Sequence, residues 1–464
     1  MVESICSAGS TSLDFSAGKD AFRASGRGSL YDKLEGVEKD GVKICAFSHN
    51  NAMLIRQFFP YAAPVRNTKY DVSIGLGDRL GIAGAGQLRA IEGRNVFPIL
   101  AQQSMRELKL TNRKYEDVLD AATWAVIKSG YKGGYGADGD HLKELKDIEY
   151  ALACGYSMIT LDCSEHIHGS VLSWDDSEVE NAYERHTAEY AYIMKKYLNK
   201  SIELAGESFL IDKKAIMRFC LVYGETIIFI RRVWSKYIKA ANVDFEISID
   251  ETDISTDPLS HYILGSELIS EGIGLTSMAP RFCGHFEKGI DYVGNIEQFS
   301  REFKIHEAIC KKLGYKISVH SGSDKFSVFP VIGELADKFH LKTAGTSWLE
   351  AVRAIAKANP ALMRGLYKYA IEVNEKAKQF YVITSGVDTL PDIDKIEDDD
   401  LPSLLDRDDV RQTMHIAYGY ILCDKKDGRY IFRDELYKTL EDNAQVYSDM
   451  LKAHFDKHLS LLGR

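Results

Sequence analysis

Three histidines of this sequence each stand just beyond a predicted strand: His166, His285 and His320. Imidazole is a good ligand for Zn²⁺, Mn²⁺ or Co²⁺. Three protein ligands with open coordination positions would form a catalytic site that leaves room for substrate oxygens. A single histidine is more often a surface or core residue, so the hypothesis requires that all three meet. We predict that they bind one divalent cation, with His168 and Glu165 as weaker candidates.

Two carboxylates also end predicted strands, Asp162 and Glu251. A pair of carboxylates on opposite sides of a bound sugar can act as general base and general acid. Burial and a nearby cation would separate their pKa values and set the roles. The structural alternative is that each carboxylate caps a loop or orients a metal-binding histidine. We predict the catalytic role for both.

Other polar side chains at strand ends are candidates for substrate binding. A carboxylate substrate needs a cation beside it, and arginine can bind a carboxylate with two hydrogen bonds. The predicted substrate-binding residues are Asp78, Arg79, Gln102, Gln103, Arg281 and Lys325. The glycine-dense stretch from Gly75 to Gly86 lacks the complete dinucleotide-binding spacing, so we interpret it as a tight loop between a strand and a helix.

Short apolar runs that alternate with helical patterns must position these residues. The predicted strands are Val72–Leu76, Val96–Ala101, Gly133–Ala137, Ser157–Leu161, Phe245–Ile249, Ile273–Ser277, Lys316–Val319 and Leu341–Ala344. Eight strands with intervening helices are typical of an α/β fold of the (β/α)₈ TIM-barrel type, whose active site lies at the carboxyl ends of the strands. A doubly wound open sheet is the alternative, but polar residues follow nearly every strand rather than one switch point.

Three segments lie outside the minimal barrel. The predicted organisation is an N-terminal segment (1–65), a catalytic barrel (66–347) and a helical C-terminal extension (348–464). A helical insertion at about 164–242, with patterns at 177–198 and 213–240, would either roof the site or enlarge the outer helical layer. The C-terminal extension would pack on the barrel or carry the contacts of a homo-oligomer. We expect disorder only in the first 25 or so residues, which are rich in Ser, Gly and Ala.

Composition argues against several classes of protein. The 464 residues carry a net charge of −10 and no long basic run, which argues against nucleic-acid binding. No apolar run is long enough to span a membrane, and the beginning of the sequence has no apolar run of a secretory signal. The eight cysteines show no paired spacing, which favours reduced, mostly buried thiols and a cytoplasmic location.

Several short motifs, taken in order, resemble the tagaturonate/fructuronate epimerase family of bacterial hexuronate catabolism. They are Gly77-Asp78-Arg79-Leu80-Gly81, Ala101-Gln102-Gln103-Ser104, Gly136-Ala137-Asp138-Gly139-Asp140-His141-Leu142, Leu161-Asp162 through Glu165-His166, Asp250-Glu251-Thr252 and Val319-His320-Ser321-Gly322-Ser323-Asp324-Lys325. The resemblance extends from about residue 65 to the C-terminus. It implies a divalent-metal enzyme with a sugar-acid substrate, Asp162 as proton acceptor, Glu251 as proton donor, and the three histidines as metal ligands.

The two keto-acids differ at a hydroxyl-bearing carbon that is not adjacent to the ketone, so removal of a C–H proton beside the carbonyl cannot invert it. We hypothesise a retro-aldol route: one carboxylate takes the hydroxyl proton, the adjacent C–C bond breaks, the aldehyde turns over, and the bond re-forms. A hydride or keto-transfer route is the rival. The alternative functions are a class II-type aldolase, an epimerase of a related keto-sugar such as tagatose or fructose, and a non-catalytic sugar-acid-binding barrel.

Overall fold

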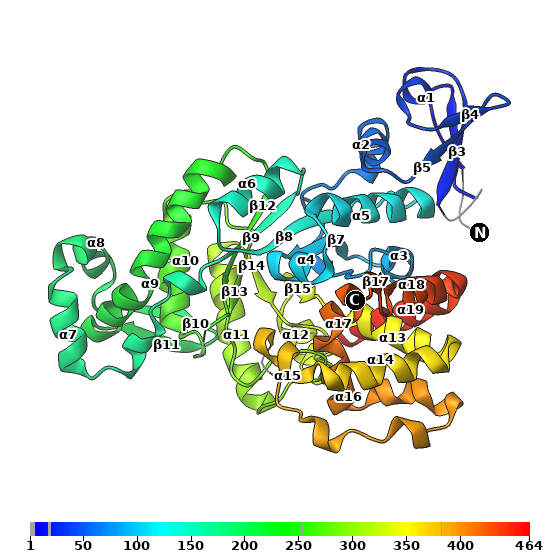
Figure 1. Cartoon of the computed structure of the whole chain (residues 1–464). Coiled ribbons are helices and arrows are strands. Elements are labelled where there is room, and N and C mark those ends of the chain that lie inside the picture. Colours follow the sequence, from blue (N-terminus) through cyan, green and yellow to red (C-terminus); the bar gives the residue numbers. More distant parts are fainter. Residues whose placement is uncertain (1–4, 17–19, 253, 382) are drawn as a thin grey trace.

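Eight parallel strands form a closed barrel at the centre of this computed structural model, which describes residues 5–16, 20–252, 254–381 and 383–464 (Figure 1). Around the barrel the order is β12-β13-β14-β15-β6-β7-β8-β9. The strands are β6 (Val72–Leu76), β7 (Phe97–Ser104), β8 (Gly136–Leu142), β9 (Met158–Asp162), β12 (Asp244–Ile249), β13 (Ser277–Pro280), β14 (Lys316–Val319) and β15 (Phe339–Thr343). The closing pair is β15 with β6, in which Phe339 is opposite Val72. This closure confirms the (β/α)₈ prediction and rules out an open sheet.

Helices cover the outside of the barrel, so its strands are buried on both faces. The barrel interior includes polar side chains such as Asp138, Glu246 and Lys342, which are at most 2% exposed. All residues of β6 and β12 are buried. The helices that follow the successive strands include α3 (Gly84–Ile91), α4 (Met105–Thr111), α5 (Tyr115–Ser129), α6 (Leu145–Ala153), α10 (Pro258–Ser270), α11 (Ile296–Leu313), α12 (Phe329–Leu335) and α13 (Thr346–Ala358). The predicted bounds of β6 and β14 are those observed, because each is a short apolar run between turn residues.

Two strands lie further along the chain than predicted. β8 begins at Gly136 rather than Gly133 and continues to Leu142, five residues beyond the predicted end at Ala137. Gly134 lies before the strand and has a positive φ of 81°, which is not a strand conformation. β13 begins only at Ser277, because the apolar residues from Ile273 form a loop that returns to the preceding helix, where Ile273 N–H donates to Leu268. The longer β8 matters for function, because it makes His141 a strand-end residue.

The N-terminal segment is an antiparallel sheet in the order β1-β2-β3-β5-β4, so the prediction of disorder there was wrong for the described residues. Its elements are β1 (Ile5–Ala8), β2 (Thr11–Asp14), β3 (Ala21–Gly26), β4 (Val37–Lys39), β5 (Val42–Ala46), α1 (Ser29–Lys33), α2 (His49–Phe58) and a 3₁₀ turn, η1 (Pro60–Ala62). Leu13 and Phe22 are fully buried, and Phe22 contacts Trp124 of α5. The segment folds because its buried side chains alternate along the strands, although its overall composition suggested disorder. Residues 1–4 and 17–19 of the predicted disordered stretch lie outside the described residues.

The insertion after β9 folds as a lobe beside the barrel, at the left in Figure 1. It contains η2 (Ser164–His166), η3 (Gly169–Ser173), α7 (Asp176–Glu184), α8 (Thr187–Tyr197), the hairpin of β10 (Lys200–Leu204) and β11 (Glu207–Ile211), α9 (Lys213–Val233) and the π-helix η4 (Trp234–Ile238). The predicted helix at 177–198 is broken at Arg185 and His186, and the hairpin was not predicted. Long helix α9 packs against α10 of the barrel.

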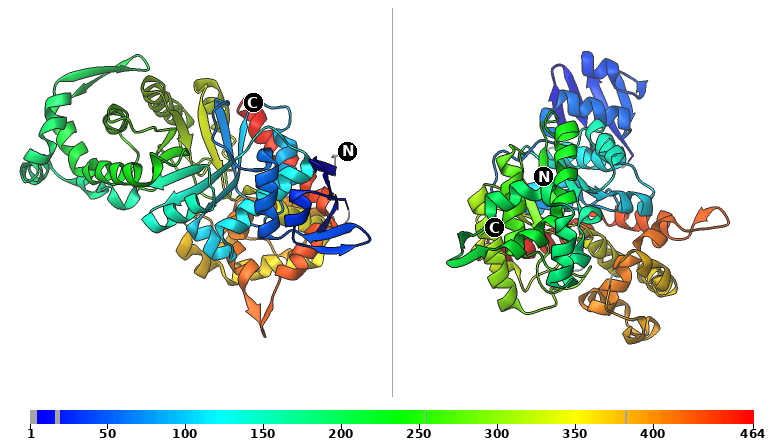
Figure 2. Two further views of the ribbon diagram at one scale, coloured as in Figure 1. Left: turned by 90° about the horizontal axis from the view of Figure 1, so that it is seen from above. Right: turned by 90° about the vertical axis from the view of Figure 1, so that its left-hand side faces the viewer.

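The C-terminal extension is mostly helical, as predicted, and packs against the opposite side of the barrel from the insertion (Figures 1 and 2). Its elements after α13 are α14 (Pro360–Glu372), α15 (Asn374–Ala377), η5 (Lys378–Phe380), η6 (Val387–Thr389), η7 (Ile393–Lys395), η8 (Asp398–Asp406), α16 (Asp408–Ile416), α17 (Tyr418–Cys423), β16 (Lys425–Lys426), β17 (Arg429–Tyr430), α18 (Arg433–Asp442) and α19 (Ala444–Leu461). Helix α19 packs along α3.

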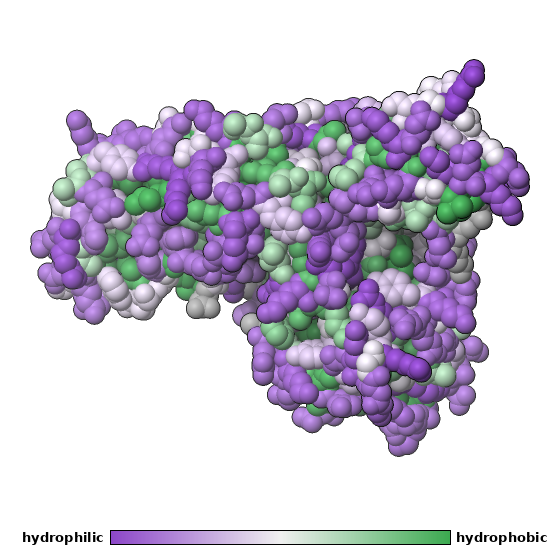
Figure 3. All heavy atoms as spheres, turned by 45° about the horizontal axis from the view of Figure 1, so that its top comes forward, coloured by the Kyte–Doolittle hydropathy of each residue, from purple (hydrophilic) through white to green (hydrophobic). Residues whose placement is uncertain are grey.

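The face of the molecule shown in Figure 3 is mostly hydrophilic, with small hydrophobic patches between hydrophilic residues. Among the described residues, every helix is too short or too polar to cross a membrane. All eight cysteines are free, and five of them are buried, as the sequence predicted.

Candidate active site at the carboxyl end of the barrel

Two adjoining cavities open at the carboxyl ends of the barrel strands, with volumes of about 390 and 450 Å³. These volumes are in the range of small-molecule sites. The first is lined by residues that follow β7, β8 and β9, and the second by residues that follow β12, β13 and β14. Both are lined by Arg106, Glu251, Lys288, Ser321 and Tyr381. The site therefore combines barrel loops with Tyr381 of the C-terminal extension. Of the described residues of the insertion, only Glu165 lines either of these two cavities, so the insertion does not roof the site.

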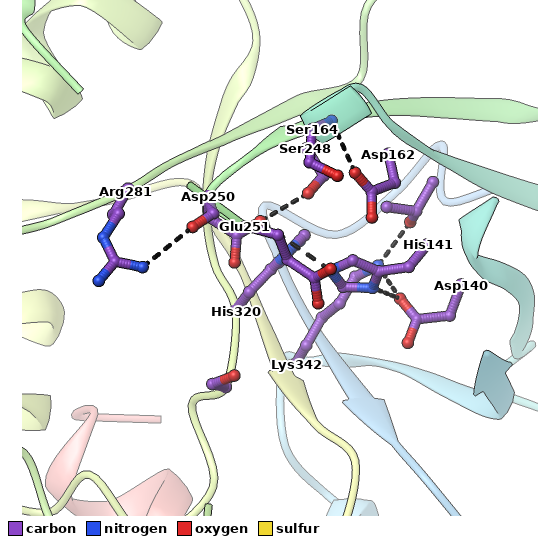
Figure 4. A network of polar contacts seen from close by, with 12 residues as sticks. Asp140, His141, Asp162, Ser164, Ser248, Asp250, Glu251, Arg281, His320 and Lys342 are labelled. Carbon is purple, nitrogen blue, oxygen red and sulfur yellow. Dashed lines mark hydrogen bonds and ion pairs between the residues drawn. The ribbon is translucent and has the colours of Figure 1, made fainter. Parts of the chain in front are cut away.

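Three side chains that line these cavities lie close together: His141, Asp250 and His320 offer ligand atoms within 4.8 Å of one another (Figure 4). His320 Nδ1 lies 3.0 Å from Asp250 Oδ1, and His141 Nε2 lies 3.9 Å from the same oxygen. The His141 and His320 ring centroids are 4.7 Å apart. Two imidazoles and a carboxylate are a donor set suited to a borderline divalent ion.

The nitrogen of each imidazole that points away from this centre contacts a buried carboxylate. His141 Nδ1 lies 2.7 Å from Asp140 Oδ1, and His320 Nε2 lies 2.7 Å from Glu246 Oε1. Burial opposes protonation of His141, but Asp140 outweighs that effect and raises the pKa of the ring to about 10, so a cation bound at its other nitrogen would displace a proton. Such carboxylate–histidine pairs fix the tautomer and ring orientation of metal-binding histidines. Each ring therefore directs its other nitrogen toward the centre.

The backbone explains why His141 reaches the centre. His141 has a positive φ of 51°, an uncommon value for a residue with a side chain, and the register of β8 with β9 shifts between Gly139 and Leu142. A bulge of this kind redirects a side chain and is common beside active sites. The irregularity turns His141 into the cavity.

Asp162 and Glu251 both line the first cavity, with Lys143 near both carboxylates. Lys143 Nζ lies 3.4 Å from Asp162 Oδ2 and 4.0 Å from Glu251 Oε2. Ser164 N–H donates to the other oxygen of Asp162. Asp162 is 1% exposed, and burial raises its pKa despite the nearby His141.

Glu251 differs from Asp162 in both exposure and charge environment. Its side chain is 40% exposed at the cavity rim. Desolvation opposes its ionisation, but His141, Arg106 and Lys288 outweigh that effect and lower its pKa. Two carboxylates in one cavity thus have pKa values shifted in opposite directions, which is the arrangement that acid–base catalysis requires.

Most of the lysine and arginine side chains that line the two cavities are not the predicted ones. Lys325 is fully buried, and its ammonium donates to the carbonyls of Ser323, Glu287 and Ile290, so its position does not support substrate binding. Arg281 lines only the second cavity and donates to the Asp250 carbonyl, 3.4 Å away (Figure 4).

Arg106 and Lys288 instead stand where the two cavities meet. Arg106 stacks on the ring of Tyr381, with 4.8 Å between the guanidinium carbon and the ring centroid. Lys288 Nζ lies 2.8 Å from Ser321 Oγ. Within the part of the chain that the structure describes, neither cation has a carboxylate within 4.0 Å. Both are free to bind a substrate anion.

Of the predicted polar residues, Gln102 lies in the first cavity and has a distinctive environment. It is 1% exposed, and among the described residues neither its amide nitrogen nor its oxygen has a hydrogen-bond partner. A Cβ atom on Gly75 would lie 1.7 Å from Gln102 Oε1, so this glycine makes space for the amide. An unpartnered buried amide is costly unless a ligand or water satisfies it.

Two of the neighbouring predicted residues, Arg79 and Asp78, have other contacts. Arg79 lines the first cavity but forms a buried ion pair with Glu107, 3.0 Å away, and stacks on Tyr418. The Asp78 carboxylate accepts from three backbone N–H groups of the loop before α3 and so closes that tight loop. Gln103 is buried, and its amide likewise has no hydrogen-bond partner among the described residues, but it lines neither cavity.

His166 and His285 do not join His320. His166 ends η2, outside both cavities, where its ring stacks on Phe229 at 4.1 Å between centroids. His285 is exposed in the second cavity, in a bridge with Val293. The geometry therefore brings together one of the three predicted ligands and adds His141 and Asp250.

Some of the site residues that were not predicted could have been found from the sequence. Asp250 is adjacent to Glu251, and Arg106 follows Gln103 within three residues, so both lie just past a predicted strand. His141 was hidden because the glycine-rich β8 gave no apolar pattern beyond Ala137. Lys143 and Lys288 lie in loops, and no local pattern identifies them.

Comparisons with known proteins agree with one another. The family UxaE, tagaturonate epimerase, matches residues 13–462. A tagaturonate/fructuronate epimerase of Thermotoga maritima is 38% identical over 439 residues, which cover 94% of this chain and 89% of the relative. The native crystal structure of fructuronate-tagaturonate epimerase UxaE from Cohnella laeviribosi has a TM-score of 0.97 at 46% identity, and the match covers 99% of this chain and 95% of that one. Its complex with one glycerol has a TM-score of 0.96 at the same identity and coverage.

Proposed function

The chain belongs to the tagaturonate epimerase family, and on that premise we propose that it interconverts D-tagaturonate and D-fructuronate with a bound divalent cation. The observation that carries the proposal is the site in Figure 4, where a carboxylate pair lies beside a cluster of ligand atoms at the carboxyl end of the barrel. The proteins from Thermotoga maritima and Cohnella laeviribosi, both named as epimerases of tagaturonate and fructuronate, support this reaction.

His141, Asp250 and His320 would hold the cation. Their ligand atoms lie close together, and both outward nitrogens contact buried carboxylates, which leaves the inward nitrogens available as ligands. Zn²⁺, Mn²⁺ or Co²⁺ bound there would supply positive charge to polarise the carbonyl and hydroxyl oxygens of a keto-sugar. His166 and His285 remain alternative ligands from the family resemblance, and their positions do not support that role.

Asp162 and Glu251 would exchange protons with the hydroxyl at the carbon to be inverted. One carboxylate takes the hydroxyl proton, the O–H electron pair becomes the new C=O bond, and the pair of the broken C–C bond passes to the ketone fragment. The aldehyde turns over, the C–C bond re-forms on its other face, and a carboxylic acid returns a proton to the oxygen. Because the reaction is reversible, each carboxylate must serve in both roles. The ammonium of Lys143, which lies near both, would stabilise whichever of the two carboxylates is ionised.

Arg106 and Lys288 would bind the substrate carboxylate. Both line both cavities and have no ion-pair partner among the described residues. A planar guanidinium can donate two hydrogen bonds to a carboxylate, and Lys288 adds a second charge. The free amide of Gln102 would bind a sugar hydroxyl. This arrangement places the acid end of the substrate toward Tyr381 and its carbonyl end toward the barrel axis.

An activity assay tests the proposal. Protein stripped with a chelator is incubated with D-tagaturonate and Mn²⁺, Zn²⁺, Co²⁺ or no metal, and D-fructuronate is measured. Product that requires a metal supports the function and the cofactor, whereas three-carbon products alone would identify an aldolase. Trapping of the aldehyde with hydroxylamine supports bond cleavage, and solvent deuterium retained at the inverted carbon would exclude it.

We place this activity in the cytoplasm, with a small-molecule substrate and with neither nucleic acid nor membrane as a partner. The eight free cysteines and the net charge of −10 support that location and that partner class. The C-terminal extension and the N-terminal sheet project from the barrel and offer surfaces on which copies of the chain could associate (Figure 2).

A further inference from the structure

Lys342 is an ammonium buried inside the barrel among three carboxylates. It lies on β15, is 2% exposed, and its Nζ is 2.8 Å from Asp138, 2.7 Å from Asp140 and 3.0 Å from Glu246. A buried lysine is costly unless its charge is paired, and here the carboxylates outnumber it. The catalytic scheme above gives this charge no task.

Two of these carboxylates use one oxygen for two contacts. Asp140 Oδ1 lies 2.7 Å from Lys342 Nζ and 2.7 Å from His141 Nδ1. Glu246 Oε1 lies 3.0 Å from Lys342 Nζ and 2.7 Å from His320 Nε2. One ammonium thus contacts both of the oxygens that orient the two imidazoles.

The contacts close into a ring. Asp250 Oδ1 completes it, at 3.9 Å from His141 and 3.0 Å from His320. In order, the ring is Lys342, Asp140, His141, Asp250, His320 and Glu246. The cation site proposed above lies on the side of this ring opposite Lys342.

We propose that Lys342 is a positioning residue for the cation site, which it preforms by holding Asp140 and Glu246 as acceptors for the two imidazoles. The inference rests on the proposed function, because it concerns the same cation site. Without the ammonium, three neighbouring buried carboxylates would repel one another. Rotation of Asp140 or Glu246 away from the other carboxylates would relieve that repulsion, and the histidine that it orients would then lose its acceptor. The inward nitrogen would no longer be fixed as a lone-pair donor.

A nucleophilic lysine is the competing role, because Lys342 also lines the first cavity. An imine with the substrate ketone would require a neutral amine and would release water. The contacts with three carboxylates oppose loss of the proton. Borohydride added with D-tagaturonate would reduce such an imine and attach the substrate mass to Lys342, and that result would overturn the positioning role.

Metal affinity provides the main test. Chelator-treated protein is titrated with Co²⁺, followed by its visible absorbance, for wild type, Lys342→Met and the control Lys316→Met. Lys316 is also a strand lysine, but its Nζ donates to the Tyr70 carbonyl, away from the ring. We expect Lys342→Met to weaken Co²⁺ binding by about 10- to 100-fold, as loss of an outer contact to metal ligands typically does, and the control to stay within about threefold. A folded Lys342→Met that binds like wild type would refute the inference.

A matched pair of carboxylate variants keeps the test decisive if Lys342→Met does not fold. Asp138 contacts Lys342 and Thr160 but no imidazole, whereas Glu246 contacts Lys342 and His320. We expect Glu246→Gln to weaken Co²⁺ binding about tenfold or more and Asp138→Asn to change it less than about threefold. Equal losses would mean that the ring is not the basis of the effect. Failure of wild type to bind Co²⁺ would refute the cation site itself, independently of Lys342.

Discussion

The substitution Arg106→Met should lower activity on sugar acids much more than activity on neutral sugars. Arg106 lies at the junction of the cavities, stacked on Tyr381, with no carboxylate within 4.0 Å among the described residues. Its guanidinium is therefore available to the substrate. Hydrogen bonds to charged groups contribute about 1.5–3 kcal/mol, and each 1.4 kcal/mol is a factor of about ten. Removal of the guanidinium should lower kcat/KM for D-tagaturonate by about 10- to 100-fold.

D-Tagatose is the informative comparison, since it has the same carbon to be inverted but no carboxylate. We expect Arg106→Met to change kcat/KM for tagatose by less than about threefold, because the lost contact belongs to the carboxylate. If tagatose turnover is too slow to follow, its inhibition constant against D-tagaturonate supplies the same comparison. Arg281→Met is the matched control, because that guanidinium donates to the Asp250 carbonyl and should discriminate less. Equal losses on acid and neutral sugar would refute the assignment of Arg106.

Three further variants test separate parts of the site. Asp162→Asn should keep the hydrogen bond from Ser164 but lower kcat by about 10²- to 10⁴-fold, and unchanged Co²⁺ affinity would show that the loss is in proton transfer. Lys325→Met leaves three buried carbonyls without a donor, so urea titration should show a loss of about 3 kcal/mol or more in the free energy of unfolding; an unchanged midpoint would contradict its structural role. Gly75→Ala should displace Gln102, which lowers thermal stability and lowers kcat/KM about tenfold or more. The double variant Gly75→Ala, Gln102→Ala should recover thermal stability but not activity. If the double variant stays as unstable as the single one, the clash is not with Gln102.

Local sequence patterns were sufficient to predict those strands whose buried residues form a clear apolar run. β6 and β14 are short apolar runs bounded by turn residues, and both were predicted with their observed bounds. The strand-end positions of Asp162, Glu251 and His320 followed from the same pattern. Parallel barrel strands direct their carboxyl ends to one face, so these residues were expected to meet, and all three line the two cavities.

The N-terminal sheet shows where composition misleads. Its Ser- and Gly-rich sequence suggests disorder, but Leu13 and Phe22 alternate with polar residues and are fully buried. A strand needs only every second residue to be apolar, because successive side chains point to opposite faces. A low average hydrophobicity can therefore conceal a folded sheet.

Sequence by itself determined the type and order of the barrel elements, the strand-end positions of Asp162 and Glu251, and the family resemblance, because these depend on residues that are close together in the chain or at fixed strand ends. Tertiary structure decided which histidines meet. The bulge at His141 brings that ring to His320, while η2 directs His166 onto Phe229. It also decided that Lys325 donates to backbone carbonyls, whereas Lys288 lines the cavities. Lys342 contacts both Asp140 and Glu246, which are far apart in the sequence. A side chain's direction depends on backbone torsion and strand register over the whole barrel, and neither is encoded within a short window of residues.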